Sequence, residues 1–105
     1  FMGFSQGATV CYEFILSLNY SWGGVFPVAG FIRDFNKGIS INKSQKDTPI
    51  IIGHGVSDEV VPVESSEKIY KVLKDNKYKV HFEKYNGGHK ISIDYLKKIS
   101  KLINT

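Results

Sequence analysis

The chain opens with the run Gly3-Phe4-Ser5-Gln6-Gly7, which has the form G-x-S-x-G. This pattern is typical of a sharp turn from a strand into a helix, in which the serine is lifted out as a nucleophile. Glycine suits both flanking positions, because a Cβ there would collide with the backbone that the turn brings close. A flexible Gly/Ser turn contains the same residues, so the run alone leaves both interpretations open.

The rest of the chain alternates between strand-like and helix-like segments. Apolar, β-branched or alternating runs indicate strands, and apolar residues spaced three and four apart indicate helices. In chain order the predicted segments are a strand remnant at 1–4, a helix at 6–18, strands at 24–29 and 49–53, a helix at 64–76, a strand at 79–85 and a helix at 91–103. Such alternation is typical of an α/β architecture with a parallel sheet. We expect one domain, or part of one, with three to four mostly parallel strands flanked by helices.

The first predicted helix carries an apolar face. Val10, Phe14 and Leu18 form this face, and Cys11 and Ile15 lie beside it. In this apolar setting we expect the cysteine to be a buried packing residue rather than a reactive thiol.

Two stretches between the predicted elements have the character of connections. Residues 19–21 are expected to end the first helix. From residue 30 to residue 47 the chain turns polar, with Asn, Lys, Ser and Gly, and we expect a long excursion there. Loops of this length are uncommon inside compact domains and are often functional.

Charge and cysteine content weigh against several classes of protein. The net charge of +4 comes from lysines, with Arg33 the only arginine, and the lysines are interleaved with acidic residues. A nucleic-acid surface more often combines clustered arginine with aromatic residues, so we expect these lysines to lie on solvated helix faces instead.

No apolar run is long enough to span a bilayer, and the polar residues near the start argue against a signal peptide. A single cysteine excludes an internal disulfide and favours a cytoplasmic location.

Three loops follow the carboxyl ends of predicted strands, and they offer Ser5, Asp58 and His89 respectively. A serine hydroxyl needs a base within hydrogen-bond reach, and the base needs a partner that fixes its tautomer. In parallel α/β sheets such loops lie side by side, and the order Ser, Asp, His is that of the α/β-hydrolases. We therefore expect a nucleophile, an acid and a base in that order. The same loop offers Glu59 as an alternative acid, and Asp58 could instead turn the loop through its side chain.

The chain has three histidines that could supply the base. His81 lies among the alternating charged residues of the strand predicted at 79–85. It is expected to be a surface residue or a packing residue. His54 ends a strand near the site. It is expected to hold the loop that carries Asp58 (residues 54–62, the acid loop) rather than accept a proton. His89 follows Gly87-Gly88, which lets a loop bring an imidazole over the sheet edge, so we favour His89 as the base.

The segments around these residues resemble the phospholipase/carboxylesterase family, which includes acyl-protein thioesterases. Three runs carry the resemblance and together span almost the whole chain: Gly3-Phe4-Ser5-Gln6-Gly7-Ala8, His54-Gly55-Val56-Ser57-Asp58-Glu59-Val60-Val61-Pro62 and Tyr85-Asn86-Gly87-Gly88-His89-Lys90-Ile91. The chain looks like the C-terminal half of that family's α/β-hydrolase fold. The resemblance implies a serine hydrolase that cleaves carboxylic esters or thioesters with Ser5, His89 and Asp58, without a metal or an organic cofactor.

The resemblance also implies roles for residues around the serine. The backbone N–H of Gln6 would be one donor to the oxyanion. Phe31, Val61 and Pro62 fall where the family lines its acyl pocket, so they are expected in the substrate pocket. The implied partner is a small ester or thioester substrate.

The chain departs from the family at its start, because several strands and helices precede the nucleophile turn in that fold. A proteolytic or expression fragment, a gene product opening near Met2, and one half of a split protein would each explain a truncated domain over residues 1–105. The second oxyanion donor normally comes from a loop after an early strand. Losing such a donor costs roughly 100- to 1000-fold in turnover. The alternative to an active hydrolase is therefore a non-catalytic remnant without a complete oxyanion hole.

Absent strands would also leave part of the sheet uncovered. We expect residues 24–29 to present a free edge, and an apolar edge readily pairs with another chain. The sequence therefore predicts a homo-oligomer, most simply a dimer, that buries this edge against its copy. An N-terminal half of the fold would cover the same edge.

Overall fold

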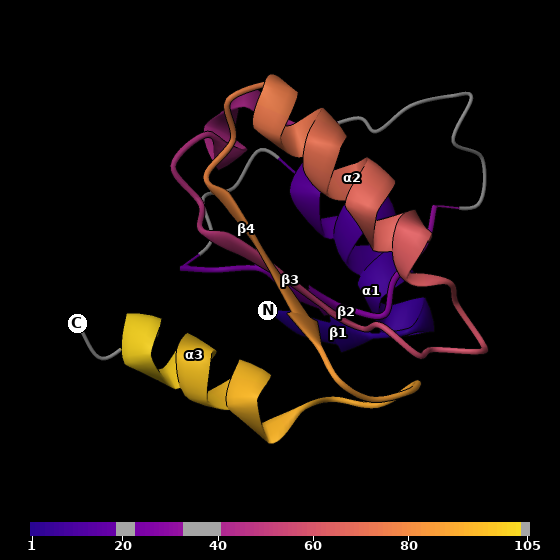
Figure 1. Ribbon diagram of the computed structural model, residues 1–105. Helices are drawn as coiled ribbons and strands as arrows, with labels where there is room; N and C mark the ends of the chain where they lie inside the picture. Colours follow the sequence, from indigo (N-terminus) through magenta and orange to yellow (C-terminus); the bar gives the residue numbers. More distant parts are fainter. Residues whose placement is uncertain (19–22, 33–40, 104–105) are drawn as a thin grey trace.

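The computed structural model of the chain describes residues 1–18, 23–32 and 41–103, with side chains up to residue 101. Four parallel strands form one sheet in the order β1-β2-β3-β4. The strands are β1 (Met2–Phe4), β2 (Phe26–Val28), β3 (Ile50–Gly55) and β4 (Val80–Tyr85), and the α-helices are α1 (Gln6–Glu13), α2 (Val63–Asp75) and α3 (Ile93–Ile103). Figure 1 shows α1 and α2 on one face of the sheet and α3 on the other. The predicted α/β architecture with a parallel sheet is confirmed.

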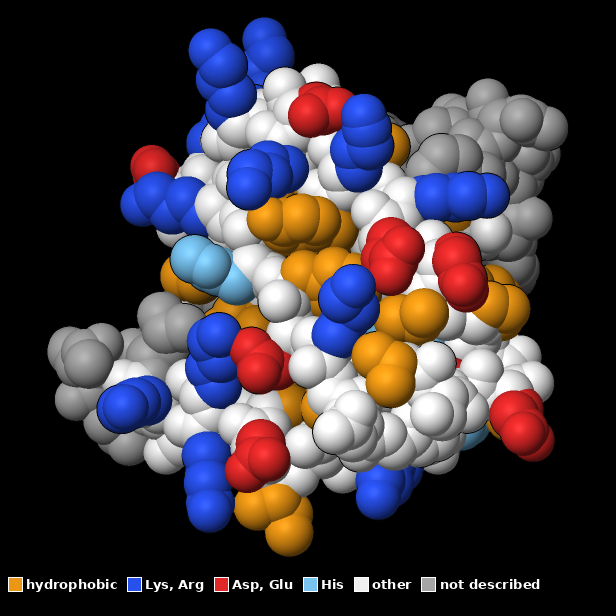
Figure 2. Space-filling model, viewed as in Figure 1, with side chains coloured by type: hydrophobic (Ala, Val, Ile, Leu, Met, Phe, Trp, Pro, Cys, Tyr) orange, Lys and Arg blue, Asp and Glu red, His pale blue; other side chains and the backbone are white. Residues whose placement is uncertain are grey.

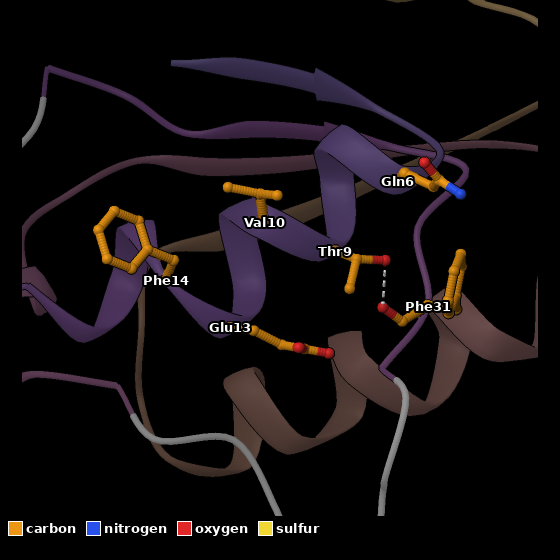
Figure 3. Close-up of a pocket in the computed structure, with 6 residues that line it drawn as sticks. All are labelled: Gln6, Thr9, Val10, Glu13, Phe14 and Phe31. Carbon is orange, nitrogen blue, oxygen red and sulfur yellow. Dashed lines mark hydrogen bonds between the residues drawn. The ribbon is translucent and has the colours of Figure 1, made fainter.

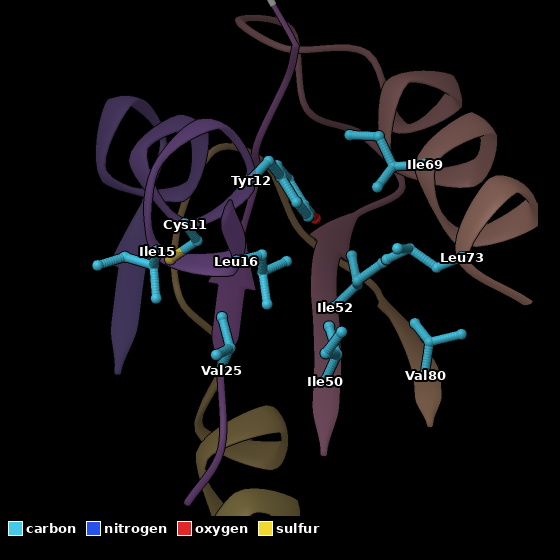
Figure 4. Packing of buried hydrophobic residues seen from close by; sticks show 10 residues of the cluster. All are labelled: Cys11, Tyr12, Ile15, Leu16, Val25, Ile50, Ile52, Ile69, Leu73 and Val80. Atoms are coloured by element: carbon cyan, nitrogen blue, oxygen red, sulfur yellow. The ribbon is translucent and has the colours of Figure 1, made fainter. Parts of the chain in front are cut away.

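Two apolar clusters form the core, one on each face of the sheet. The first lies between the sheet and the α1–α2 layer (Figure 4), and its buried members are Cys11, Tyr12, Ile15, Leu16, Val25, Ile50, Ile52, Ile69, Leu73 and Val80. The second lies against α3, and its buried members are Phe26, Val28, Ala29, Ile51, Tyr85, Tyr95 and Ile99. Because successive side chains of a strand point to opposite faces, Ile50 and Ile52 join the first cluster and Ile51 the second. Strand β3 is therefore buried on both faces, as its uncharged sequence predicts.

Helix α3 is seated against β3 by a close approach at Gly53. A Cβ at this position would lie 2.6 Å from the ring of Tyr95, so a larger residue would push the helix away. The Tyr95 hydroxyl donates to the carbonyl oxygen of Ile51 at 2.5 Å, which satisfies a buried polar group. This contact fixes where the chain returns after β4.

Helix α1 differs from the predicted helix in length and in orientation. It ends at Glu13 and is followed by a 3-10 helix over Ile15–Ser17. Cys11 is fully buried, as predicted. Val10 and Phe14 are 45% and 56% exposed, so the apolar face predicted for them points away from the core. The helix is apolar on more than one side, and its spacing alone did not identify the side that packs on the sheet.

Two predicted connections lie partly or wholly outside the described residues. The helix end expected at residues 19–21 is outside them, and so are residues 33–40 of the excursion predicted for 30–47. The described remainder of this excursion contains a 3-10 helix over Lys43–Gln45. There the side chain of Asn42 accepts a hydrogen bond from the Ser44 N–H at 3.0 Å.

The prediction that residues 24–29 form a free sheet edge is wrong. Strand β2 pairs with β1 on one side and with β3 on the other, so β1 is the outer strand. The sheet order follows the chain order, which places the strand before the serine at the outside. Phe1 and Met2 at this edge are 49% and 41% exposed.

Charged side chains of both signs mix over the face that α2 and β4 present (Figure 2). Two ion pairs cross between elements here: Lys84 Nζ lies 3.4 Å from a Glu67 carboxylate oxygen, and Lys98 Nζ lies 2.7 Å from one of Glu83. This mixing agrees with the prediction of solvated lysines rather than a single basic patch. In the part of the chain that the structure describes, no helix is long and apolar enough to cross a membrane.

Candidate active site

Ser5 occupies the sharp turn between β1 and α1. Its backbone has φ 57° and ψ −110°, a conformation that residues with a side chain rarely adopt. The Ser5 N–H donates to the carbonyl oxygen of Val28 at 2.8 Å, which ties the turn to β2. A Cβ at Gly3 would lie only 2.2 Å from the carbonyl oxygen of Gly7, so this position requires glycine.

Gly7, the second glycine of the run, is under no such constraint. A Cβ there would meet no heavy atom of the described chain within 4 Å. The predicted collision at both flanking positions is therefore correct for Gly3 and wrong for Gly7. Gly7 already belongs to the first turn of α1, where a Cβ would face open space.

Asp58 lies in the loop after β3, and its side chain is fully buried. Its Oδ1 accepts hydrogen bonds from the backbone N–H groups of Val60 and Val61, both at 2.8 Å. Its Oδ2 lies 2.8 Å from Nδ1 of His89. Burial opposes the charge on this carboxylate, but the two backbone N–H groups and the imidazole outweigh burial and hold the pKa of Asp58 below its usual value. The side chain is therefore a carboxylate at neutral pH.

His89 connects the serine to the acid. Its Nδ1 faces Asp58 at 2.8 Å, and its Nε2 lies 3.1 Å from Oγ of Ser5. Because a carboxylate only accepts hydrogen bonds, Nδ1 carries the proton, and Nε2 is left to accept one from the serine hydroxyl. The ring of Phe4 lies against the imidazole, with the two ring centroids 4.7 Å apart. The three residues predicted from the sequence thus form one chain of contacts.

The acid loop and the histidine loop are joined to each other directly. The backbone N–H groups of Val56 and Ser57 donate to the carbonyl oxygens of Tyr85 and Gly87 at 2.9 and 3.0 Å. The two loops approach so closely that a Cβ at Gly55 would lie 2.4 Å from the Gly87 carbonyl oxygen. The acid and the imidazole are therefore placed relative to each other by the adjoining ends of β3 and β4.

The competing candidates do not take the place of the acid or the base. Glu59 and His81 are exposed. His54 is fully buried, with Nδ1 at 2.6 Å from Oγ of Ser66 and Nε2 at 2.7 Å from the carbonyl oxygen of Val61. These contacts agree with the expectation that His54 holds the acid loop.

A hollow of about 430 Å³ opens beside Ser5. Its lining residues come from the serine turn, the chain after β2 and the acid loop: Ser5, Gln6, Phe31, Val60, Val61, Pro62 and Ser65. The sequence predicted Phe31, Val61 and Pro62 at this place, and the structure brings all three together. The serine hydroxyl thus borders a largely apolar hollow.

Sequence reasoning missed two residues of this lining. Val60 is 68% exposed, and its place directly before Val61 in the same loop was the available sequence signal. Ser65 lies in the first turn of α2, and its hydroxyl donates to the carbonyl oxygen of Gly30 at 2.9 Å. That bond ties the helix to the chain after β2, a long-range contact for which the sequence holds no signal.

A second hollow, of about 570 Å³, lies along the outer side of α1. Figure 3 shows its lining side chains, which are Gln6, Thr9, Val10, Glu13, Phe14 and Phe31. Gln6 and Phe31 line both hollows, and the Thr9 hydroxyl donates to the Phe31 carbonyl oxygen at 2.9 Å. The second hollow therefore adjoins the candidate site at Gln6 and Phe31, and Val10 and Phe14 line it farther along the helix.

The remaining reactive groups that the structure describes form no second centre. Within residues 1–18, 23–32 and 41–103, no three His, Cys, Asp or Glu side chains are grouped so that they could hold a metal ion. Burial raises the pKa of the Cys11 thiol to about 11, so this side chain stays protonated and unreactive at neutral pH. The chemistry of the described chain therefore centres on the serine, the histidine and the acid.

Known proteins resemble this chain in both sequence and structure. Residues 1–105 match the family described as phospholipase/carboxylesterase. Acyl-protein thioesterase 1 of Kluyveromyces lactis is 30% identical over 110 residues, which cover 97% of this chain and 47% of that protein. The crystal structure of Arabidopsis thaliana SOBER1 has a TM-score of 0.83 at 28% identity, covering 98% of this chain and 50% of that one. A phospholipase/carboxylesterase from Dyadobacter fermentans has a TM-score of 0.82 at 29% identity, covering 100% and 51%.

The chain spans about half the length of the relatives it matches. Within that half, the solved structures follow it across nearly every residue. This likeness confirms the predicted α/β-hydrolase fold. It covers the segments that carry the serine, the acid and the histidine.

Proposed function

The chain belongs to the phospholipase/carboxylesterase family, and from that premise we propose that it hydrolyses carboxylic esters or thioesters through a serine acyl-enzyme. The observation that carries the proposal is the continuous contact from Ser5 Oγ through the imidazole of His89 to the buried carboxylate of Asp58. A serine activated in this way attacks acyl carbon atoms.

In the first half of the reaction, Oγ of Ser5 bonds to the substrate carbonyl carbon as Nε2 of His89 takes the hydroxyl proton. The Asp58 carboxylate stabilises the imidazolium and keeps Nδ1 protonated. The imidazolium then gives its proton to the departing alcohol or thiol, which leaves an acyl ester on the serine. Water repeats these steps in the second half, and the acid product and the free serine are released.

The carbonyl oxygen becomes negative in each half, and it needs hydrogen-bond donors at that moment. Among the described residues we assign the backbone N–H of Gln6 to this task. Gln6 is the first residue of α1, where no earlier helical turn can accept its N–H. Since the fold normally draws a second donor from a loop near an early strand, the described residues alone are expected to turn over slowly.

The hollow beside the serine supports the substrate class. Phe31, Val61 and Pro62 give it apolar walls, which suit the acyl part of an ester or thioester. Val60 at the rim is exposed and can contact the same group. We therefore assign the acyl chain to this hollow and the leaving group to its open side.

A fluorophosphonate tests the proposal, because it bonds covalently to an activated serine without needing turnover. We expect one adduct by intact mass, located on the peptide that contains Ser5, and no adduct in His89→Ala. Ser57→Ala serves as a matched control, because Ser57 is exposed in the acid loop and its hydroxyl is assigned no role. Folded protein that gains no adduct would refute the proposal.

A non-catalytic remnant is the second candidate, and the position of β1 favours it. The strand that places Ser5 is the outer strand, with Phe1 and Met2 exposed beside it. This candidate predicts negligible ester turnover, and restoration of turnover when a separately produced N-terminal half of a family member is added. Turnover by the chain alone would exclude it.

We further propose that a second copy of the chain covers the β1 edge. Among the described residues no strand pairs with the outer side of β1, and an edge strand presents unpaired backbone groups. Val10 in α1 and Phe14 directly after it add exposed apolar surface. Sedimentation at micromolar concentration is expected to report a dimer. A monodisperse monomer would contradict the proposal.

A further inference from the structure

We infer that His54 and Ser66 are positioning residues, which hold the acid loop so that the Asp58 carboxylate meets His89. The inference rests on the proposed function, because it assigns a task to residues that touch no substrate. It concerns a histidine at the end of β3 and a serine in the first turns of α2, both fully buried.

The hydrogen bonds of His54 fix its tautomer. Nε2 lies 2.7 Å from the Val61 carbonyl oxygen, which can only accept, so Nε2 carries the ring proton. Nδ1 is then an acceptor, and the Ser66 hydroxyl donates to it at 2.6 Å. Both ring nitrogens are satisfied in one neutral form, which a buried imidazole requires.

This arrangement binds the acid loop from two sides. The Val61 carbonyl oxygen is held by His54, and the Val61 N–H is held by Oδ1 of Asp58 at 2.8 Å. Nε2 of His54 also lies 3.4 Å from Oδ2 of Asp58, the same oxygen that faces His89. His54 therefore connects both ends of the segment in which the acid lies.

Ser66 extends this connection to a helix. Because α2 packs on the sheet through Ile69 and Leu73, which are fully buried, its first turns are fixed relative to β3. The hydroxyl of Ser66 transmits that position to the imidazole of His54. The acid thus takes its place from β3 and α2 together, rather than from the loop alone.

A packing role and a positioning role make different demands on His54. Packing needs only a side chain of similar volume, whereas positioning needs a donor that reaches the Val61 carbonyl oxygen. Glutamine can place an amide N–H near the position of Nε2, and asparagine is too short to do so. We therefore expect His54→Gln to retain the function of the loop and His54→Asn to lose it.

The test reads the Asp58–His89 contact by proton NMR, without requiring turnover. A ring N–H that is bonded to a buried carboxylate exchanges slowly with water and gives a separate downfield signal. We expect this signal from Nδ1–H of His89 in the wild type and in His54→Gln. In His54→Asn and Ser66→Ala we expect it to broaden or disappear through exchange with water.

Fluorophosphonate labelling of Ser5 provides the second readout. Misplacing a catalytic group by ~1 Å can lower a rate ~100-fold, so labelling in His54→Asn is expected to slow by a factor approaching this value. Ser66→Ala should slow labelling less, because the Val61 bond remains. If His54→Asn does not fold, Ser66→Ala alone is compared with the wild type.

Thr48→Val is the matched control, because it removes another buried hydroxyl far from the site, one that donates to Gln45 at 2.8 Å. It should lower the free energy of unfolding while leaving the downfield signal and the labelling rate unchanged. If Ser66→Ala and His54→Asn behave like this control, the positioning inference is wrong.

The two readouts separate this inference from the proposed function. A downfield signal that is present in the wild type and lost in His54→Asn supports the positioning role, even if no variant labels. Labelling that fails in a wild type with an intact signal refutes the proposed function alone. A wild type without the signal would contradict both.

Discussion

The β3–β4 side of the sheet and its β1 edge differ in how extensively they pair and how deeply they are buried. At one end, β3 and β4 are six residues each and pair along their whole length, from Ile50↔Val80 to Gly55↔Tyr85. At the other edge, β1 has three residues and, within the described part of the chain, pairs only with β2, over Met2↔Phe26 to Phe4↔Val28. The acid and the histidine come from the long strands, and the serine comes from the short one.

The side chains around the two ends differ in the same direction. The β3–β4 end carries joined loops and a fully buried network around His54. At the β1 edge, Met2 on the strand, Val10 on α1 and Phe14 directly after α1 are exposed. The acid–base pair is therefore a preassembled unit, whereas the position of the nucleophile depends on an outer strand and one constrained turn.

The largest expected effect comes from removing the acid of the preassembled unit. In Asp58→Asn the amide can donate to Nδ1 of His89 and so reverse the tautomer, for which the precedent in serine hydrolases is a loss of ~10⁴-fold. We expect a loss of this order in the rate of fluorophosphonate labelling. Asp75→Asn, at an exposed residue of α2, should label like the wild type. An equal rate in both variants would show that the carboxylate has no role.

A pair of glycine variants tests the turn at the other end. In Gly3→Ala the new Cβ would lie 2.2 Å from the Gly7 carbonyl oxygen, so the turn must shift and labelling is expected to fall by at least ~100-fold. The downfield signal of His89 should remain, because the β3–β4 end is untouched.

Gly7→Ala is the matched control for this turn, since its Cβ meets no described atom within 4 Å. It should label near the wild-type rate and gain up to ~1 kcal/mol of stability, because alanine favours a helix more than glycine does. Similar labelling rates in the two glycine variants would mean that the turn does not determine the position of Ser5.

Truncations in the strands measure the difference in stability directly. Ile52→Ala empties a fully buried site in β3 and should lower the free energy of unfolding by ~2–5 kcal/mol. Met2→Ala in β1 removes a side chain that is 41% exposed and should cost less than ~1 kcal/mol. Urea unfolding monitored by circular dichroism gives both values. Equal losses would contradict the proposed difference between the two ends.

The smallest effect is the pH dependence that Asp58 contributes. Its pKa in the folded protein lies below the ordinary value of 3.8, so its stabilising contribution is complete above that pH and is lost as the pH falls through 3.8 toward the folded pKa. The difference in unfolding free energy between wild type and Asp58→Asn should therefore shrink below pH ~4. A difference that stays constant across this range would be incompatible with the lowered pKa.

Local signals in the sequence predicted much of the fold and the meeting of the three side chains. The G-x-S-x-G run fixed the strand–turn–helix order around Ser5, and the loops after two further strands offered Asp58 and His89 in the order of the fold. Their convergence follows from the geometry of a parallel sheet.

What the sequence did not reveal depends on contacts between distant segments. The order of strands decides which edge is free, and no local pattern in residues 24–29 indicates that β1 lies outside them. The apolar spacing of α1 fits two helix faces, so it could not show that Val10 and Phe14 point outward. Ser65 joins the pocket through a bond to the chain after β2, which only the folded backbone brings near.

Trapping the acyl-enzyme tests the central claim most directly. The protein is mixed briefly with an activated ester of a short fatty acid, quenched in acid and digested, and the peptides are weighed. The account predicts an acyl group on Ser5 in the wild type and none in His89→Ala. Folded wild-type protein with no acyl group on Ser5, or with the acyl group on another residue, would contradict it.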